Sequence, residues 1–153
     1  MTEDDATRAA VDDETLRYVG RLFGRRDEVQ RTSLFPSNKS ESLVISLDES
    51  YYPPDITDVT LEIRAYTNGD FHISYVEFHS GERRRCRWDR HGQPHSSRDH
   101  FHPLPNAGTE AAVDREYPTD LTRVLELVVL PWIDDRVGAL WEWAPSSWAA
   151  SMD

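Results

Sequence analysis

The sequence predicts an α+β fold, in which an antiparallel sheet of about five strands packs against a helix near each end of the chain. Three observations support this prediction. Apolar and polar residues alternate in short segments between residues 29 and 89, apolar residues recur at helical spacing in 13–27 and 119–143, and turn-forming residues separate these segments. A chain of 153 residues suits a single domain, here 1–153.

The first expected element is a helix over residues 13–27. Residues 1–11 are acidic and polar, which predicts a disordered tail. Asp12 or Asp13 can cap the helix that follows. Two glycines weaken it. Its apolar residues stand at helical spacing: Leu16, Val19, Leu22 and Phe23.

The first two strands are expected at residues 29–36 and 43–47. The second of them has a clean alternation of Leu43, Ile45 and Leu47. A polar stretch joins the two segments. They therefore predict a hairpin with a long loop.

Residues 59–89 give the clearest pattern, a three-stranded meander. Odd-numbered apolar residues define one face of the first two strands, and Asn68-Gly69 between them predicts a two-residue type I′ turn with two positive φ angles. Ser80-Gly81 predicts the next turn. In the third strand Cys86 and Trp88 are expected to face the core, with the remaining alternate residues on the opposite face.

The rest of the chain is expected to be a long loop over residues 92–118 and a helix from Thr119 or Asp120 to about Trp143. Pro131 lies inside this helix and is expected to kink or split it. Both helices are predicted to pack on the apolar face of the sheet.

The charge of the chain points to its environment. The net charge is −11, and the 17 basic residues include one lysine, Lys39. An acidic, lysine-poor surface is typical of proteins from a cytoplasm of molar salt, so we expect a halophilic source. Under such selection the net charge does not exclude nucleic-acid binding. We find no signal peptide and no apolar stretch that could span a membrane, which predicts a cytoplasmic protein.

The chemistry is expected in the stretch Arg83–Pro103, which holds six arginines and four of the six histidines. Arginine forks match phosphate oxygens, and imidazole can act as acid or base near neutral pH. Acid, base and cations are what a metal-independent ribonuclease needs. The sequence predicts no cofactor. The single Cys86 is expected to be a small buried residue and not a nucleophile.

Three other interpretations stay open for the same stretch. His91, His95, His100 and His102 with a nearby aspartate have the ligand count of a zinc site, although Gly92 and Pro94 remove the helical spacing. The stretch could also be structural, with pairs such as Arg98–Asp99 or Arg90–Asp89. The fourth interpretation is a protein-binding surface anchored by the C-terminal tryptophans Trp141, Trp143 and Trp148.

Two passages resemble known proteins: residues 61–105, with Trp88-Asp89, His95 and His100-Phe101-His102-Pro103, and residues 117–141. They resemble small haloarchaeal proteins of unknown function and, more distantly over residues 58–142, toxins of the TumE type. Arg90 stands where that family usually has Asn. The resemblance implies the toxin half of a type II toxin–antitoxin pair, with ribonuclease activity and an antitoxin protein as partner.

The leading hypothesis is therefore a toxin-type ribonuclease that acts on RNA without a metal. The alternative is a non-catalytic interaction domain whose Arg/His loop binds a protein or an acidic partner. The oligomeric state is left open between a monomer and a homodimer. The expected catalytic residues are Asp89, His95, His100 and His102, and the expected substrate-binding residues are Arg83, Arg85, Arg87 and Arg98.

Overall fold

A computed structural model of the protein describes residues 9–92 and 98–143. The helical elements are α2 (Asp13–Phe23), η1 (Glu49–Tyr51), α3 (Leu121–Val124), the π-helical turn η2 (Leu125–Val129) and α4 (Leu130–Trp143). The strands are β1 (Val29–Phe35), β2 (Ser42–Leu47), β3 (Ile56–Ala65), β4 (Phe71–His79), β5 (Glu82–Arg90), β6 (Asp99–His102) and β7 (Val113–Arg115).

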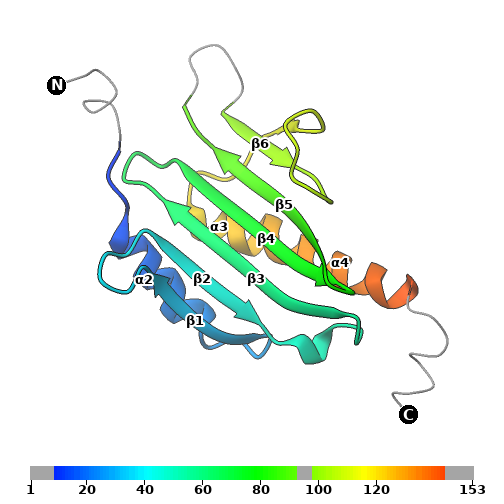
Figure 1. The fold of residues 1–153 in the computed structure, drawn as a ribbon. Coiled ribbons are helices and arrows are strands. Elements are labelled where there is room, and N and C mark those ends of the chain that lie inside the picture. Colours follow the sequence, from blue (N-terminus) through cyan, green and yellow to red (C-terminus); the bar gives the residue numbers. More distant parts are fainter. Residues whose placement is uncertain (1–8, 93–97, 144–153) are drawn as a thin grey trace.

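The described strands form one antiparallel sheet in chain order, from β1 at one edge to β7 at the other (Figure 1). The α+β class is confirmed, but the sheet has seven strands and not five. The two unpredicted strands, β6 and β7, lie in the stretch 92–118 that was expected to be a loop. Strands of four and three residues are too short to show an alternating pattern.

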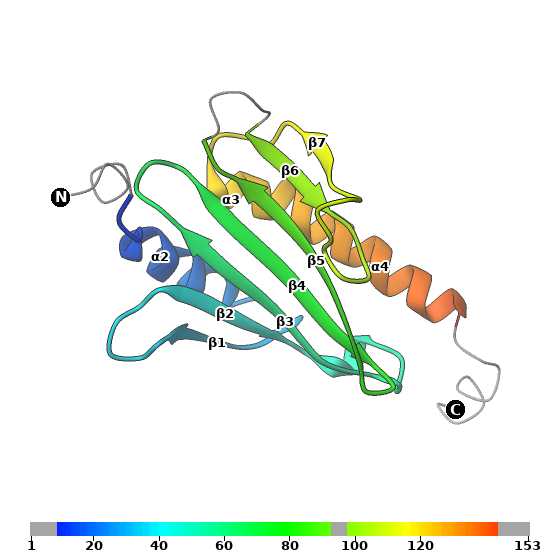
Figure 2. The same ribbon diagram turned by 45° about the horizontal axis from the view of Figure 1, so that its top comes forward.

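Both ends of the chain supply a helix to the same face of the sheet, as predicted. Figure 2 shows α2 behind β1 and β2, and α3 with α4 behind the middle and the β7 side of the sheet. The apolar residues of both helices join the apolar face of the strands in one buried core. No helix of residues 9–92 and 98–143 lies over the opposite face of the sheet, and we call this face the open face.

The N-terminal helix begins where the sequence predicts and ends earlier. Asp12 caps it by accepting the backbone N–H of Thr15 at 3.1 Å. The helix ends at Phe23, and the N–H of Gly24 after it donates to the carbonyl of Gly20 at 2.9 Å. The predicted disordered tail is wrong for its last residues, since Val11 forms a β-bridge with Tyr66. Residues 1–8 lie outside the described part.

The loop between β3 and β4 corrects one turn prediction. Of Asn68 and Gly69, only Gly69 has a positive φ, +93°, and Ala65 pairs with Phe71. The loop is therefore one residue longer than a type I′ turn. A two-residue turn would have placed Ala65 opposite His72 and turned the apolar residues of one strand to the wrong face. The hydrophobic alternation of both strands thus decided the register against the local turn signal.

The C-terminal helix starts at the cap Asp120 and ends at Trp143, close to the predicted bounds. Pro131 does not split it. The turn before the proline is a π-helix, in which the N–H of Leu130 donates to the carbonyl of Leu125, five residues back. The wider turn accommodates a residue that cannot complete the α-helical ladder.

A buried ion pair joins this helix to the sheet. Glu77 of β4 is fully buried on the core face, and both its oxygens accept from Arg136 of α4 at 2.8 Å. The hydroxyl of Tyr75 donates to the same carboxylate at 2.9 Å and lies 3.2 Å from that of Tyr52. Burial raises the pKa of both tyrosines, so they stay protonated. The pair ties α4 to the middle of the sheet.

None of the helices in the described ranges combines the length and the apolar character that crossing a membrane requires.

Candidate functional site

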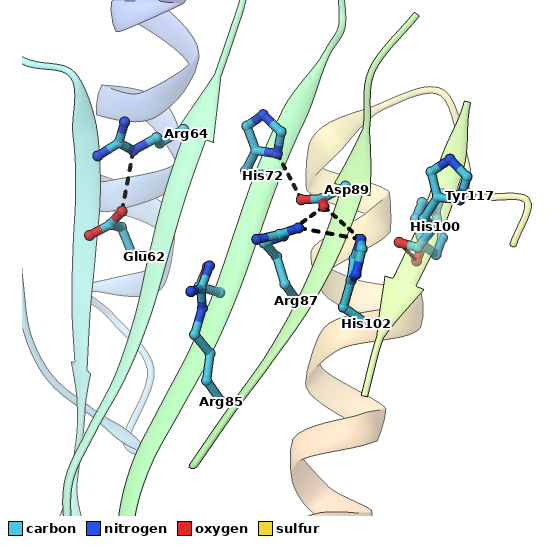
Figure 3. Close-up of polar contacts among 10 residues, drawn as sticks. Glu62, Arg64, His72, Arg85, Arg87, Asp89, His100, His102 and Tyr117 are labelled. Carbon is cyan, nitrogen blue, oxygen red and sulfur yellow. Dashed lines mark hydrogen bonds and ion pairs between the residues drawn. The ribbon is translucent and has the colours of Figure 1, made fainter. Parts of the chain in front are cut away.

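The polar residues of the central strands gather on the open face. There β4 presents His72 and Ser74, β5 presents Arg85, Arg87 and Asp89, and β6 presents His100 and His102 (Figure 3). Cys86 and Trp88 lie on the core face and are buried, as predicted. Burial raises the pKa of the Cys86 thiol, which keeps it protonated and a poor nucleophile.

Asp89 is the centre of this arrangement. Its Oδ1 lies 2.7 Å from Nδ1 of His72, and its Oδ2 lies 2.6 Å from Nε of Arg87 and 3.1 Å from Nε2 of His102. The side chain is only 2% exposed. One buried carboxylate therefore holds two imidazoles and one guanidinium from three strands. We call these four residues the Asp89 cluster.

The register of the strands explains why these side chains meet. Ser80 and Gly81, with φ angles of 51° and 83°, form the turn between β4 and β5, and the pairing that follows places His72 directly opposite Asp89. On the other side of β5, Asp89 pairs with His100 and Arg87 with His102. Opposite and diagonal neighbours on one face of a sheet are within reach of long side chains.

The hydrogen bond to Asp89 sets the state of His72. An ionised carboxylate can only accept, so Nδ1 of His72 carries the proton and donates. In the neutral ring Nε2 is then the basic atom, and it points away from Asp89 (Figure 3). The side chain of His72 is 37% exposed. A histidine oriented by a buried aspartate, with its second nitrogen accessible, is the arrangement of a general base.

Asp89 itself stays ionised. Burial acts to raise its pKa, but hydrogen bonds from His72 and Arg87 and the positive charge of Arg87 lower it more, so the pKa lies below its usual value. The negative charge is therefore available at neutral pH to hold both imidazoles.

His102 is more enclosed than His72. Its Nε2 contacts Asp89 and lies 3.4 Å from Nη2 of Arg87, while Nδ1 lies 3.4 Å from the carbonyl oxygen of Gly108. Both ring nitrogens are thus occupied, and only 8% of the side chain is exposed. This geometry suits a residue that fixes Asp89 and Arg87 better than one that exchanges protons with a ligand.

Further rings continue the cluster along β6. His100 lies beside His102 and His91, with ring centroids 6.4 and 5.7 Å apart, and His91 lies 6.2 Å from His72. Nδ1 of His100 is 3.3 Å from a carboxylate oxygen of the exposed Asp114 of β7. Imidazoles therefore surround Asp89 on β4, β6 and the end of β5.

Arginines extend the open face along β5. Arg85 donates to Ser74 at 3.4 Å and is partly buried. Burial and the neighbouring charges of Arg87 and Arg83 lower its pKa, as expected where like charges are close together. Arg83, at the start of β5, is exposed and lies further along the same face.

Two other arginines are structural. Arg90 forms a bidentate ion pair with Asp99 at 2.8 and 2.9 Å, and also donates to the carbonyls of Tyr117, Pro118 and Thr119. It thereby fastens the segment that leads into the C-terminal helix. The suggested partner of Arg90 is therefore wrong, since Arg90 pairs with Asp99 and not with Asp89. Arg98 lies 3.5 Å from Asp70, and its positive charge also lowers the pKa of Asp99.

The structure thus brings together part of the predicted site. Asp89, Arg87 and His102 meet directly, and His100 and Arg85 lie beside them. Arg98 points to Asp70 and is not in the cluster. His95 lies outside the described residues. The sequence interpretation missed His72, although counting equal steps back and forward from the Ser80-Gly81 turn places it opposite Asp89.

The geometry also bears on the metal-site and protein-binding interpretations of Arg83–Pro103 and the C-terminal tryptophans. In residues 9–92 and 98–143, no group of three or more histidine, cysteine, aspartate or glutamate side chains is placed to hold a metal ion. Of the three tryptophans offered as an anchor, Trp141 donates to the carbonyl of Tyr51 at 2.9 Å and Trp143 is exposed. Trp148 lies outside the described residues.

Comparison with known proteins gives the relationship of the chain. None of the curated proteins and none of the solved structures matches it. Residues 19–137 match a family described as Toxin TumE. The match includes the last five residues of the N-terminal helix, 19–23, and the first hairpin, so it reaches further toward the N-terminus than the predicted resemblance over 58–142. It spans well over half of the sequence, and the chain therefore belongs to the TumE toxin family.

Proposed function

We propose that this TumE-family protein acts in the cytoplasm as a toxin that cleaves RNA without a metal ion, on the open face of β4, β5 and β6. One observation carries the proposal. The buried Asp89 holds Nδ1 of His72 at 2.7 Å and leaves the other ring nitrogen directed outward, beside a row of arginines. Family membership supports the toxin type.

The reaction would be an internal transfer of the phosphate ester. Nε2 of His72 takes the proton from a 2′-hydroxyl, and the 2′-oxygen attacks the adjacent phosphorus. The bond from phosphorus to the 5′-oxygen breaks as His100 gives that oxygen its proton. The products are a 2′,3′-cyclic phosphate and a 5′-hydroxyl. His100 lies on the same face as His72, on the other side of Asp89.

The remaining cluster residues would position the substrate and the base. Arg87 would face the negative charge that develops on the phosphate, because guanidinium groups bind phosphate oxygens in pairs, and Arg85 would contact a neighbouring phosphate. Arg83 would contact a phosphate further along the strand. Asp89 orients His72, and His102 holds Asp89 and Arg87 in place. His95 remains a candidate acid for the same step.

The test is cleavage of labelled RNA by the purified full chain, in the presence and absence of a chelator. We expect chelator-resistant cleavage that yields a 2′,3′-cyclic phosphate end, and no cleavage when the target nucleotides lack the 2′-hydroxyl. The variant Arg123→Ala is the control, because Arg123 is an exposed arginine of α3, on the other side of the sheet from the Asp89 cluster. Cleavage of the 2′-deoxy substrate, or loss of cleavage on chelation, would contradict the mechanism.

We also propose that the protein works in a cytoplasm of high salt. The single lysine among 17 basic residues and the net charge of −11 support this setting. The expected result is a melting temperature that rises steadily from dilute to molar KCl. A melting temperature that is independent of KCl would contradict it.

The alternative function is a non-catalytic interaction domain. The full occupation of both ring nitrogens of His102 favours it, since a closed network of ion pairs is also a structural device. A folded protein that cleaves no RNA, yet binds an acidic protein in a manner that depends on Arg85 and Arg87, would establish this alternative.

A further inference from the structure

The two edges of the sheet differ in length. The edge strand β7 has three residues, whereas β1 has seven and pairs only with β2 among the described strands (Figure 2). In an antiparallel ladder every second residue of an edge strand directs its N–H and C=O away from the sheet. Such a long unpaired edge is a template for another extended chain unless the protein blocks it. In β1 there is no proline and no lysine to do so.

A groove runs beside this edge. It has a volume of about 290 Å³ and lies between α2, with Arg17 and Arg21, and β1, with Ser33 and Leu34. Gly20 of α2 faces the sheet, where a Cβ would lie 3.2 Å from a methyl group of Leu43, so the helix packs closely below the strand. A strand added to β1 would therefore pass along the arginine side chains of α2.

The surroundings of the groove are less acidic than the chain as a whole. Residues 12–41, which include α2 and β1, carry six basic and six acidic side chains, whereas the whole chain has a net charge of −11. Arg21 and Arg31 are exposed and have no ion pair within the described ranges. The opposite sign of charge is thus what this surface is suited to bind.

An exposed aromatic residue stands at the end of the same strand. Phe35 is 64% exposed, on the side of β1 that carries Arg31 and Ser33. Large aromatic side chains are typical anchors at the centre of protein interfaces. The edge therefore combines free backbone groups, positive charge and an apolar anchor.

We propose that an extended acidic segment of a partner protein binds β1 as an additional strand of the sheet. Its backbone would pair with the outer edge of β1. Carboxylates on one face of the added strand would lie against Arg21 of α2, and carboxylates on its other face would lie against Arg31 on the open face. A nucleic acid could use the charges but could not continue the backbone ladder. A second copy of this chain would place two Arg31 side chains on the same face of the joined sheet, where like charges repel. Two strands, β2 and β3, separate the site from β4 and the Asp89 cluster, so the proposal stands independently of the ribonuclease activity.

The experiment uses the full chain and a capped, labelled nonapeptide in which pairs of glutamates alternate with pairs of valines, so that both faces of the strand carry carboxylates. Binding is followed by fluorescence anisotropy at the lowest KCl concentration at which the protein is folded, and amide hydrogen exchange is compared with and without the peptide. We expect saturable binding and slower exchange confined to β1 and its neighbours. The double variant Arg21→Glu/Arg31→Glu should bind at least about tenfold more weakly.

Three controls make the result specific. The variant Arg123→Glu reverses one charge at an exposed residue of α3, half of the change in the double variant, and should bind like the wild type. A peptide of the same sequence with every amide N-methylated should not bind, because it cannot form the ladder. A peptide with lysine in place of glutamate should not bind either.

Each of several outcomes would overturn the proposal. Equal binding of the N-methylated peptide would show that charge acts without strand pairing. Protection of amides elsewhere, or no saturable binding of the acidic peptide, would remove β1 as its site. Displacement of the acidic peptide by single-stranded RNA at equal charge would make this edge part of a nucleic-acid surface.

Discussion

Two buried carboxylates, Glu77 and Asp89, lie on neighbouring strands and face opposite sides of the same sheet. Both are almost fully inaccessible, and both pair with an arginine. Glu77 is covered by α4, and its partner Arg136 is only 9% exposed. Asp89 is reached from the open face, where its partners His72 and Arg87 remain 37% and 27% exposed.

The difference lies in the partners and not in the carboxylates. Glu77 binds one permanently charged group and a tyrosine hydroxyl, so nothing in its surroundings can exchange a proton with solvent near neutral pH. Asp89 binds two imidazoles, one of which has an outward nitrogen. We infer that the first pair fixes the position of the helix and the second prepares chemistry.

The largest effect is expected from His72→Ala. Loss of a general base lowers the rate of cleavage by about 10²- to 10⁴-fold, whereas the melting temperature changes little because the side chain is partly exposed. The rate of RNA cleavage at saturating substrate is the measurement. The same assay on Arg123→Ala, an exposed residue of α3, should give the wild-type rate. A His72→Ala variant that retains the wild-type rate and pH profile would refute the assigned role.

The second-largest effect is expected from substitution of Glu77, and it concerns the free energy of unfolding. Glu77→Gln leaves Arg136 buried without its counter-charge, and should lower the free energy of unfolding by about 3–5 kcal/mol. Urea denaturation measures this change, and cleavage per folded molecule should be unaffected. The double variant Glu77→Leu/Arg136→Met should recover most of the stability, because it leaves no unpaired charge. A Glu77→Gln variant as stable as the wild type would show that the pair is not needed for the helix position.

Much of the fold could be predicted from the sequence because its signals are local. The alternation in β2 to β5 gave the strands and their faces, and the capping residues Asp12 and Asp120 marked the starts of both helices. The Asn68-Gly69 signal failed, since the faces of two long strands outweigh the preference of one turn.

The site could be predicted only in part because its members come from separate strands. Asp89 and Arg87 stand two residues apart in β5 and were identified together, but His72 is 17 residues away from Asp89 and enters the cluster through the register. Arg136 is 59 residues from Glu77, and no pattern in the sequence connects them. Pairings of this kind follow from the assembled sheet and helix, not from spacing.

The way in which the free energy of unfolding falls at acidic pH should distinguish Asp89 from an ordinary surface carboxylate. Its pKa is lower in the folded than in the unfolded chain, where aspartate titrates near about 3.9. Its ion pairs therefore contribute stability above that pH, and the contribution is lost as the pH falls through the folded value. Asp99 contributes to the same loss of stability at acidic pH. Burial acts to raise its pKa, but hydrogen bonds from Arg90 and from the N–H of Tyr117 lower it more.

We expect the stability difference between the wild type and Asp89→Asn to be constant near neutral pH and to narrow below about pH 4. The measurement is the free energy of unfolding from neutral pH to pH 2 at fixed ionic strength. The free energy of unfolding of Asp89→Asn should still fall at acidic pH, by the amount expected from protonation of Asp99. Two parallel curves over the whole range would mean that Asp89 has the same pKa in both states.

The smallest effect is expected for Arg85→Ala, and it concerns binding alone. Arg85 lies beside the Asp89 cluster, and the hydrogen bond that its side chain forms within the described residues is a long one to Ser74, so its removal should leave the cluster and the catalytic step intact. If it contacts one phosphate, the dependence of log affinity on log salt for single-stranded RNA becomes shallower by about 0.7. Affinity for an uncleavable 2′-deoxy-substituted RNA across a KCl series measures this slope. Arg123→Ala, on the opposite side of the sheet, should keep the wild-type slope; an unchanged slope for Arg85→Ala would remove Arg85 from the path of the RNA.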